Sequence, residues 1–138
     1  MECAQLWLRE DGIEIEPYGL DILPELVELA RRRLPHWADH IWLGNALHWT
    51  PPLRFDFVRT GLEYVPRPLR ANLVRHLLDV AVAPGGRLII GPNSEVAGSP
   101  SALEAEVRDW GFRIGGRLEV PHDEDERVVR RAVRIESD

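Results

Sequence analysis

The first half of the chain carries a pattern of hydrophobic and polar positions that predicts two helices and two strands. Met1–Glu10 places its apolar residues on one side of a short helix. Pro17–Leu34 predicts a short strand that ends on the acid Asp21 and continues directly into a second helix. Pro24 suits the first turn of that helix, because its missing N–H would be unpaired there in any case. His40–Leu47 is predicted to be the next strand.

The second half predicts two further helices, two single strands and a closing hairpin. Apolar runs and Pro/Gly punctuation divide it, in chain order, into a strand at Phe55–Leu62, a helix from Pro66 to Ala81, a tight turn at Ala83–Gly86, a strand at Arg87–Ile90, a helix beginning at Ser99–Pro100, and hairpin strands at Gly111–Val120 and Arg127–Glu136. The polar run His122–Glu126 is the predicted hairpin turn.

The order of these elements predicts an α/β fold. Strands that alternate with helices form a mostly parallel, doubly wound sheet with helices on both faces. We therefore expect a three-layer sandwich in which the C-terminal hairpin adds an antiparallel strand. The sequence shows no internal repeat and no linker, so residues 1–138 are expected to form a single domain.

Composition and charge narrow the classes of function. The chain is 44% hydrophobic and 29% charged, as ordinary soluble globular proteins are. Its net charge of −6 disfavours a general nucleic-acid or acidic-membrane binder, which needs a basic face. Cys3 is the single cysteine and excludes an internal disulfide, and no apolar run is long enough to span a bilayer. A cytoplasmic location without membrane attachment is expected.

The residue types that are missing also limit the chemistry. All 17 residues in the Lys and Arg count are arginines. The absence of lysine excludes the phosphate lysine of a P-loop, Schiff-base chemistry and the catalytic lysine of many short-chain dehydrogenases. The five histidines form no set with the spacing of metal ligands, so no metal site is predicted.

Asp21 is the candidate functional residue around which the other elements are arranged. A carboxylate at the carboxyl end of a strand in an open α/β sheet lies where ligands bind and accepts hydrogen bonds from a ribose. The alternative is a structural acid that caps the following helix or is solvated at the strand end. The pattern by itself leaves both readings open.

Four segments together resemble the class I S-adenosylmethionine-dependent methyltransferases. YGLDILPELVELARRR resembles the second strand of that family, its acidic end and the helix after it. HIWLGNALHW resembles the third strand and its Gly-Asp-Ala-like turn, FDFVRTGLEYV the fourth strand, and LLDVAVAPGGRLII the helix, Pro-Gly-Gly turn and fifth strand. The order and spacing of the four segments carry the resemblance, which covers the chain from about Glu10 onward.

The resemblance assigns roles to eight residues. It implies that Asp21 holds the ribose hydroxyls of S-adenosylmethionine and that Ile22 lies against the adenine. The remaining implied residues are Asn45 and Ala46 at the adenine edge, Arg59 and Thr60 near the methionine part, and Glu63 and Tyr64 as candidate catalytic residues on the substrate side. Many relatives have aspartate at the position of Asn45, which is otherwise a common turn residue.

The sequence departs from the family at its N-terminal end. The first strand of the family and its glycine-rich loop should precede the Met1–Glu10 helix, and no Gly-x-Gly occurs before Gly12. We therefore expect an N-terminally truncated form with weak cofactor affinity. Strand edges left unpaired by the missing strand are costly. The gap is predicted to close by pairing of the Asp21 and Phe55 strands, or by a strand from a partner chain such as a second copy, with Ile13–Glu16 as a candidate donor.

Three functions compete. The first is a methyltransferase, or a truncated form of one, that uses S-adenosylmethionine to methylate a small-molecule or protein acceptor. The second is a catalytically inactive methyltransferase-like domain that acts in dimerisation or partner binding. The third, a nicotinamide-dependent dehydrogenase, shares the acid at the strand end but lacks the dinucleotide fingerprint.

Overall fold

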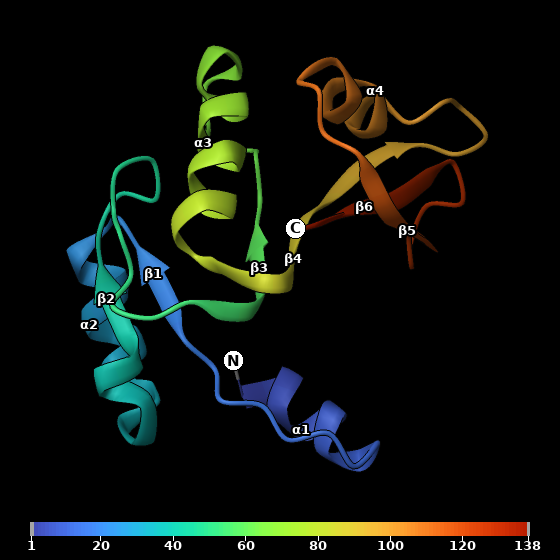
Figure 1. Ribbon diagram of the computed structural model, residues 1–138. Coiled ribbons are helices and arrows are strands. Elements are labelled where there is room, and N and C mark those ends of the chain that lie inside the picture. The colour runs from blue at the N-terminus through green and yellow to red at the C-terminus, as the bar shows by residue number, and fades with distance from the viewer. Residues whose placement is uncertain (1, 138) are drawn as a thin grey trace. The chain divides into compact units, whose positions relative to one another are not determined.

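The computed structural model describes residues 2–137, and for Glu2 the backbone only. These residues form two compact units that divide after Trp49, and each unit is described by itself (Figure 1).

The first unit contains a two-stranded parallel sheet and three helical segments. Its elements are helix α1 (Glu2–Glu10), strand β1 (Gly19–Asp21), helix α2 (Pro24–Arg33), the 3₁₀ helix η1 (Pro35–His40) and strand β2 (Ile41–Leu43). The predicted helices and strands are confirmed, although β2 is shorter than expected. The 3₁₀ helix is an addition that the sequence pattern did not predict.

Helix α2 and strand β2 hold the first unit together. Val27 on α2 and Ile41 on β2 are 2% and 3% exposed and form its apolar core. The guanidinium of Arg31 donates from Nε and Nη2 to the carbonyl oxygen of Ile41, at 3.0 and 2.6 Å. A charged fork on one carbonyl is stronger than a neutral hydrogen bond. It therefore fixes the C-terminal turn of α2 against the first residue of β2.

The second unit is a four-stranded mixed sheet with two helices. Its elements are β3 (Phe55–Thr60), α3 (Arg67–Val80), β4 (Val82–Val96), α4 (Ala102–Asp109), β5 (Ile114–Pro121) and β6 (Val128–Glu136). The strand order is β3-β4-β6-β5, in which β3 and β4 are parallel and β6 is antiparallel to both β4 and β5. The predicted C-terminal hairpin is confirmed.

The core of the second unit lies under its two helices. Leu88 and Ile90 on β4 face Ile135 and Val133 on β6, and all four side chains are at most 3% exposed. The helices cover them with five buried apolar residues: Leu73, Val74 and Leu77 from α3, and Leu103 and Val107 from α4. An ion pair of 3.1 Å between Arg70 and Glu106 joins the two helices to each other.

Three details of the second unit differ from the prediction. The expected turn at Ala83–Gly86 is part of β4, where it forms an irregularity in the pairing with β3. Helix α4 is capped by Ser101, whose hydroxyl accepts the N–H of Glu104 at 3.2 Å, and not by Ser99. The expected mostly parallel sheet is a mixed one, because β6 inserts antiparallel between β4 and β5.

The expected pairing of the Asp21 and Phe55 strands is wrong. Among residues 2–137, β1 pairs only with β2 and β3 pairs only with β4, in two separate sheets. The segment Ile13–Glu16 forms no strand, so it does not act as an intramolecular donor. Each of β1 and β3 therefore has one edge without a partner strand in the described part of the chain.

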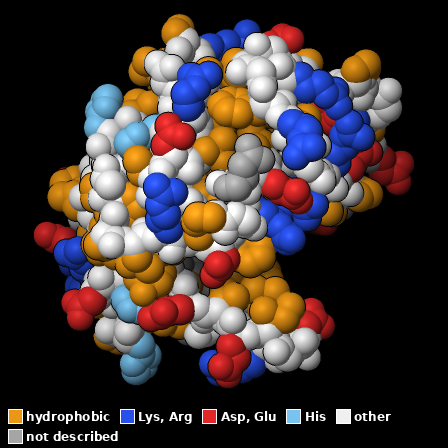
Figure 2. Space-filling view, viewed as in Figure 1, with side chains coloured by type: hydrophobic (Ala, Val, Ile, Leu, Met, Phe, Trp, Pro, Cys, Tyr) orange, Lys and Arg blue, Asp and Glu red, His pale blue; other side chains and the backbone are white. Residues whose placement is uncertain are grey.

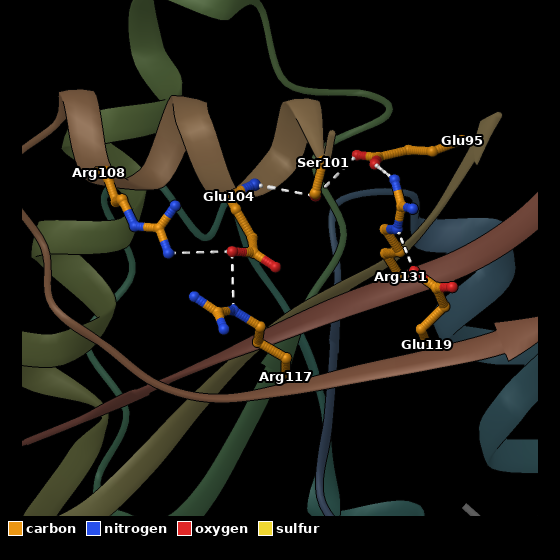
Figure 3. A network of polar contacts seen from close by, with 7 residues as sticks. All are labelled: Glu95, Ser101, Glu104, Arg108, Arg117, Glu119 and Arg131. Carbon is orange, nitrogen blue, oxygen red and sulfur yellow. Dashed lines mark hydrogen bonds and ion pairs between the residues drawn. The ribbon is translucent and has the colours of Figure 1, made fainter. Parts of the chain in front are cut away.

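An ionic network around the buried Arg131 connects β4, β5, β6 and α4 (Figure 3). Arg131, which is 8% exposed, donates to Glu95 at 2.7 Å and to Glu119 at 2.6 Å. Glu95 also accepts the N–H of Leu103 at 2.9 Å and the Ser101 hydroxyl at 3.3 Å, and so it caps α4 from the sheet. Over the same elements, arginine and acidic side chains lie side by side at the surface (Figure 2).

The protonation state of Glu95 follows from these contacts. Burial by itself raises the pKa of the Glu95 carboxyl, but the hydrogen bonds from Arg131, Leu103 and Ser101 outweigh it and hold that pKa below its ordinary value of 4.5. The same contact raises the pKa of the Arg131 guanidinium. Both groups are therefore charged at neutral pH.

Replacement of Glu95 should produce a pH-dependent loss of stability. A folded-state pKa below 4.5 stabilises the fold fully above pH 4.5, and this contribution disappears as the pH falls through the folded-state pKa. Glu95→Gln should lower the free energy of unfolding by about 2 kcal/mol at pH 7, since charged hydrogen bonds are lost. Urea unfolding at a series of pH values should show the difference narrowing below pH 4.5. Glu124→Gln, at an exposed turn, is the control, and a pH-independent difference at Glu95 would contradict the assignment.

Candidate cofactor site

Asp21 lies at the carboxyl end of β1, as predicted. Its backbone is paired with Leu43 of β2, and its carbonyl oxygen accepts the N–H of Gly44 at 2.9 Å. One carboxylate oxygen, Oδ1, accepts the N–H of Leu23 at 2.9 Å and so helps to start α2. The other oxygen has no partner within residues 2–137 and is the one that a ligand hydroxyl can reach. Asp21 thus uses one carboxylate oxygen to hold the start of α2 and keeps the other as a hydrogen-bond acceptor.

Asn45 begins a turn at the carboxyl end of β2. Its Oδ1 accepts the N–H of Leu47 at 3.0 Å, and its carbonyl oxygen accepts the N–H groups of His48 and Trp49. The side-chain amide of Asn45 is exposed and keeps its NH₂ group unengaged among the described residues. Because β1 and β2 are parallel, Asp21 and Asn45 lie at the same edge of the two-stranded sheet.

Two apolar residues adjoin these polar groups. Ile22 follows Asp21 and is 58% exposed, which is unusual for isoleucine and leaves an apolar surface beside the carboxylate. Ala46 follows Asn45 and is half-buried. Gly44, between the strand and the turn, lies so close to Trp49 that a Cβ there would come within 2.8 Å of the indole ring. Glycine is therefore required for this turn to pack on Trp49.

Stacked aromatic rings lie beside β1 and β2. Sequence reasoning did not assign these rings to the site. Tyr18 stacks on His40 with ring centroids 4.2 Å apart and on Trp42 at 5.2 Å, and Trp42 contacts Trp49 at 5.1 Å. Partial burial raises the pKa of the Tyr18 phenol above 10.0, and the Glu16 carboxylate raises it further. Tyr18 is therefore neutral at physiological pH. The nearness of Trp42 and Trp49 in the sequence is the signal from which this packing could have been predicted.

Arg59 and Thr60 lie at the carboxyl end of β3 in the second unit. Thr60 is paired with Ile90 in the last step of the parallel β3–β4 ladder. Arg59 donates from Nε to the carbonyl oxygen of Gly91 at 3.0 Å, which orients its guanidinium at the end of the ladder. The guanidinium has no carboxylate partner among the residues described, so it remains available to an anionic group.

Glu63 and Tyr64 occupy a turn that follows β3. The turn is anchored by Leu62, which is 1% exposed, and by a hydrogen bond of 3.1 Å from the N–H of Val65 to the Leu62 carbonyl. Glu63 is exposed, and Tyr64 is 99% exposed. Both side chains thus reach solvent from a fixed turn, and neither is packed in the core.

No group of three or more His, Cys, Asp or Glu residues within residues 2–137 is arranged to hold a metal ion. In the same part of the chain, no helix has the length and apolar character needed to cross a bilayer.

The two roles of Asp21 can be separated by substitution. Asp21→Asn keeps an oxygen for the Leu23 N–H, so the free energy of unfolding should stay within about 0.5 kcal/mol of the parent protein. Asp21→Ala removes that oxygen and should cost about 1 kcal/mol. Urea unfolding of both variants measures this. Equal stability of Asp21→Ala and the parent protein would show that the hydrogen bond to α2 contributes nothing.

Comparison with solved structures identifies the fold. N-methyltransferase NodS from Bradyrhizobium japonicum WM9 matches 86% of this chain and 71% of its own, with a TM-score of 0.63 and 15% identity. Magnesium protoporphyrin IX methyltransferase from Synechocystis PCC 6803, solved with bound S-adenosylmethionine, matches 99% of this chain and 77% of its own (TM-score 0.63, 15% identity). A methyltransferase from Thiobacillus denitrificans, in complex with S-adenosyl-L-homocysteine, matches 99% and 81% (TM-score 0.67, 14% identity).

Sequence comparison adds no closer relative. No protein-family model and no curated protein matches the chain. The likeness therefore rests on structure, and it agrees with the order of segments in the sequence. The chain has the fold of the class I S-adenosylmethionine-dependent methyltransferases.

Proposed function

We propose that the chain is a methyltransferase domain that binds S-adenosylmethionine and transfers its methyl group to a small-molecule or protein acceptor. One observation carries the proposal: the parallel pairing of β1 and β2 places the free carboxylate oxygen of Asp21 and the amide of Asn45 at the same edge of a sheet. Carboxyl ends of parallel strands are where such folds bind nucleoside ligands.

The residues of the first unit fit the nucleoside part of the cofactor. The free oxygen of Asp21 accepts a ribose hydroxyl, while its other oxygen stays on the N–H of Leu23. Ile22 offers its exposed apolar surface to the adenine ring, and the NH₂ of Asn45 donates to the ring edge, next to Ala46. Because the ligand contacts only the atoms of Asp21 and Asn45 that have no partner, the local turns held by their other atoms stay intact when it binds.

The residues of the second unit are proposed to serve the reacting part of the ligand. The sulfonium of the cofactor supplies an activated methyl group. Arg59, oriented by Gly91, offers its guanidinium to an anionic group, while the Thr60 hydroxyl, which donates to the carbonyl oxygen of Gly61 at 3.1 Å, lies on the opposite face of β3. Glu63 is the proposed acceptor of a proton from the substrate and Tyr64 a proposed substrate contact, since both are exposed on the turn after β3. Orientation and proton removal are the two needs of such a displacement.

Two finer architectural features of the family are also proposed for this chain. These are a single methyltransferase-like domain over residues 1–138 and a three-layer sandwich with helices on both faces of the sheet. The chain spans 71 to 81% of the length of the three solved chains.

A second candidate function is favoured by the unpaired strand edges. β1 and β3 each leave one edge without a partner strand in the part of the chain that the structure describes. Exposed edges recruit further strands. A methyltransferase-like domain that forms a homodimer, and thereby completes its sheet, is the alternative that this observation supports.

Calorimetry with S-adenosylhomocysteine tests the first candidate. Binding in the micromolar to millimolar range is expected, and Asp21→Ala and Asp21→Asn should both weaken it about tenfold or more, because a hydrogen bond to a charged group is lost. Asp39→Ala, an acid of the same unit outside the proposed site, is the matched control and should bind as the parent does. The absence of binding at millimolar ligand would overturn the methyltransferase proposal and leave the dimer candidate.

A further inference from the structure

Gly61 lies between strand β3 and the turn that carries Glu63. The strand ends at Thr60, whose hydroxyl donates to the carbonyl oxygen of Gly61 at 3.1 Å. Leu62 then enters the core, and the N–H of Val65 closes the turn on the Leu62 carbonyl at 3.1 Å. These contacts fix the backbone on both sides of Glu63.

The carboxylate of Glu63 folds back over Gly61. A Cβ placed on Gly61 would overlap Oε2 of Glu63 and lie 3.4 Å from its Cδ. Apart from the chain neighbours of Gly61, the three atoms nearest to that position all belong to the Glu63 carboxyl group. Neither oxygen of this group has a hydrogen-bond or ion-pair partner within residues 2–137. The carboxylate therefore lies at the carboxyl end of β3 with both oxygens available to a ligand.

The backbone conformation does not require glycine at this position. The φ angle of Gly61 lies outside the left-handed region, unlike the φ angles of Gly85 and Gly98. Alanine therefore fits the backbone there, and its one obstacle is the end of a flexible side chain, which can rotate to another rotamer. Gly61→Ala should thus keep the fold and displace the Glu63 carboxylate.

We propose that Gly61 is a positioning residue for methyl transfer: its missing side chain lets the Glu63 carboxylate lie against the end of β3, facing the methyl-bearing part of the ligand. The inference rests on the proposed function, in which Glu63 takes a proton from the acceptor. An acceptor that attacks through a lone pair gains positive charge until its proton leaves, and a carboxylate at that point stabilises the charge. The stabilisation weakens as the carboxylate moves away.

Calorimetry of the full chain with two ligands tests the proposal. S-adenosylhomocysteine is neutral at sulfur, whereas sinefungin carries an ammonium in place of the methyl of the sulfonium. Gly61→Ala and Glu63→Gln should each lower the affinity for sinefungin, relative to that for S-adenosylhomocysteine, by about threefold, because an exposed ionic contact is lost. The double variant should lose no more than either single variant, since both changes remove the same contact.

Gly115→Ala is the matched control. A Cβ at Gly115 also meets a glutamate of the second unit, with Cδ of Glu136 at 3.0 Å, at the start of β5. This variant should keep the relative affinity of the parent protein for the two ligands. Circular dichroism verifies that all variants are folded.

The outcomes separate the inference from the proposed function. An unchanged relative affinity in Gly61→Ala, with a reduced one in Glu63→Gln, overturns the positioning role of Gly61. A relative affinity insensitive to both substitutions overturns the contact of the Glu63 carboxylate with the ligand. If the parent protein binds neither ligand at millimolar concentration, the proposed function fails and the inference fails with it.

Discussion

Hydrogen bonding of strand backbones is the constraint on which the rest of this structure depends. A parallel pair needs a long crossover, and here each of the two parallel pairs, β1–β2 and β3–β4, is connected through helical segments. That arrangement brings the carboxyl ends of paired strands to one edge within each unit. The same constraint leaves one edge of β1 and of β3 without a partner among the described residues.

An apolar core and an ionic network around Arg131 stabilise the second unit in different ways. The side chains of Leu88, Ile90 and Val133 pack under the helices without directional requirements. The network of Arg131 and Glu95 is directional: it fixes the N-terminus of α4 to the sheet through the N–H of Leu103. Buried ion pairs favour one arrangement over others when every group has its partner.

The order of helices and strands could be predicted because each has a hydrophobic period and an end signal, as in Pro24 at the start of α2. The pairing of the strands and the residue that caps α4 could not be predicted. The pairing of the Asp21 and Phe55 strands was wrong because strand partners depend on contacts distant in sequence. Ser101 caps α4 although Ser99–Pro100 matches the capping pattern equally well. Asp21 and Asn45 were found at one edge as expected, but only coordinates reveal which of their atoms are already engaged.

The central claim is that Asp21 and Asn45, at the carboxyl ends of β1 and β2, bind the nucleoside part of S-adenosylmethionine. Titration of ¹⁵N-labelled protein with S-adenosylhomocysteine, followed by amide chemical shifts, tests it most directly. Saturable shifts at Asp21, Ile22, Asn45 and Ala46 with one common dissociation constant are predicted. The absence of saturable shifts at these residues at millimolar ligand would contradict the claim.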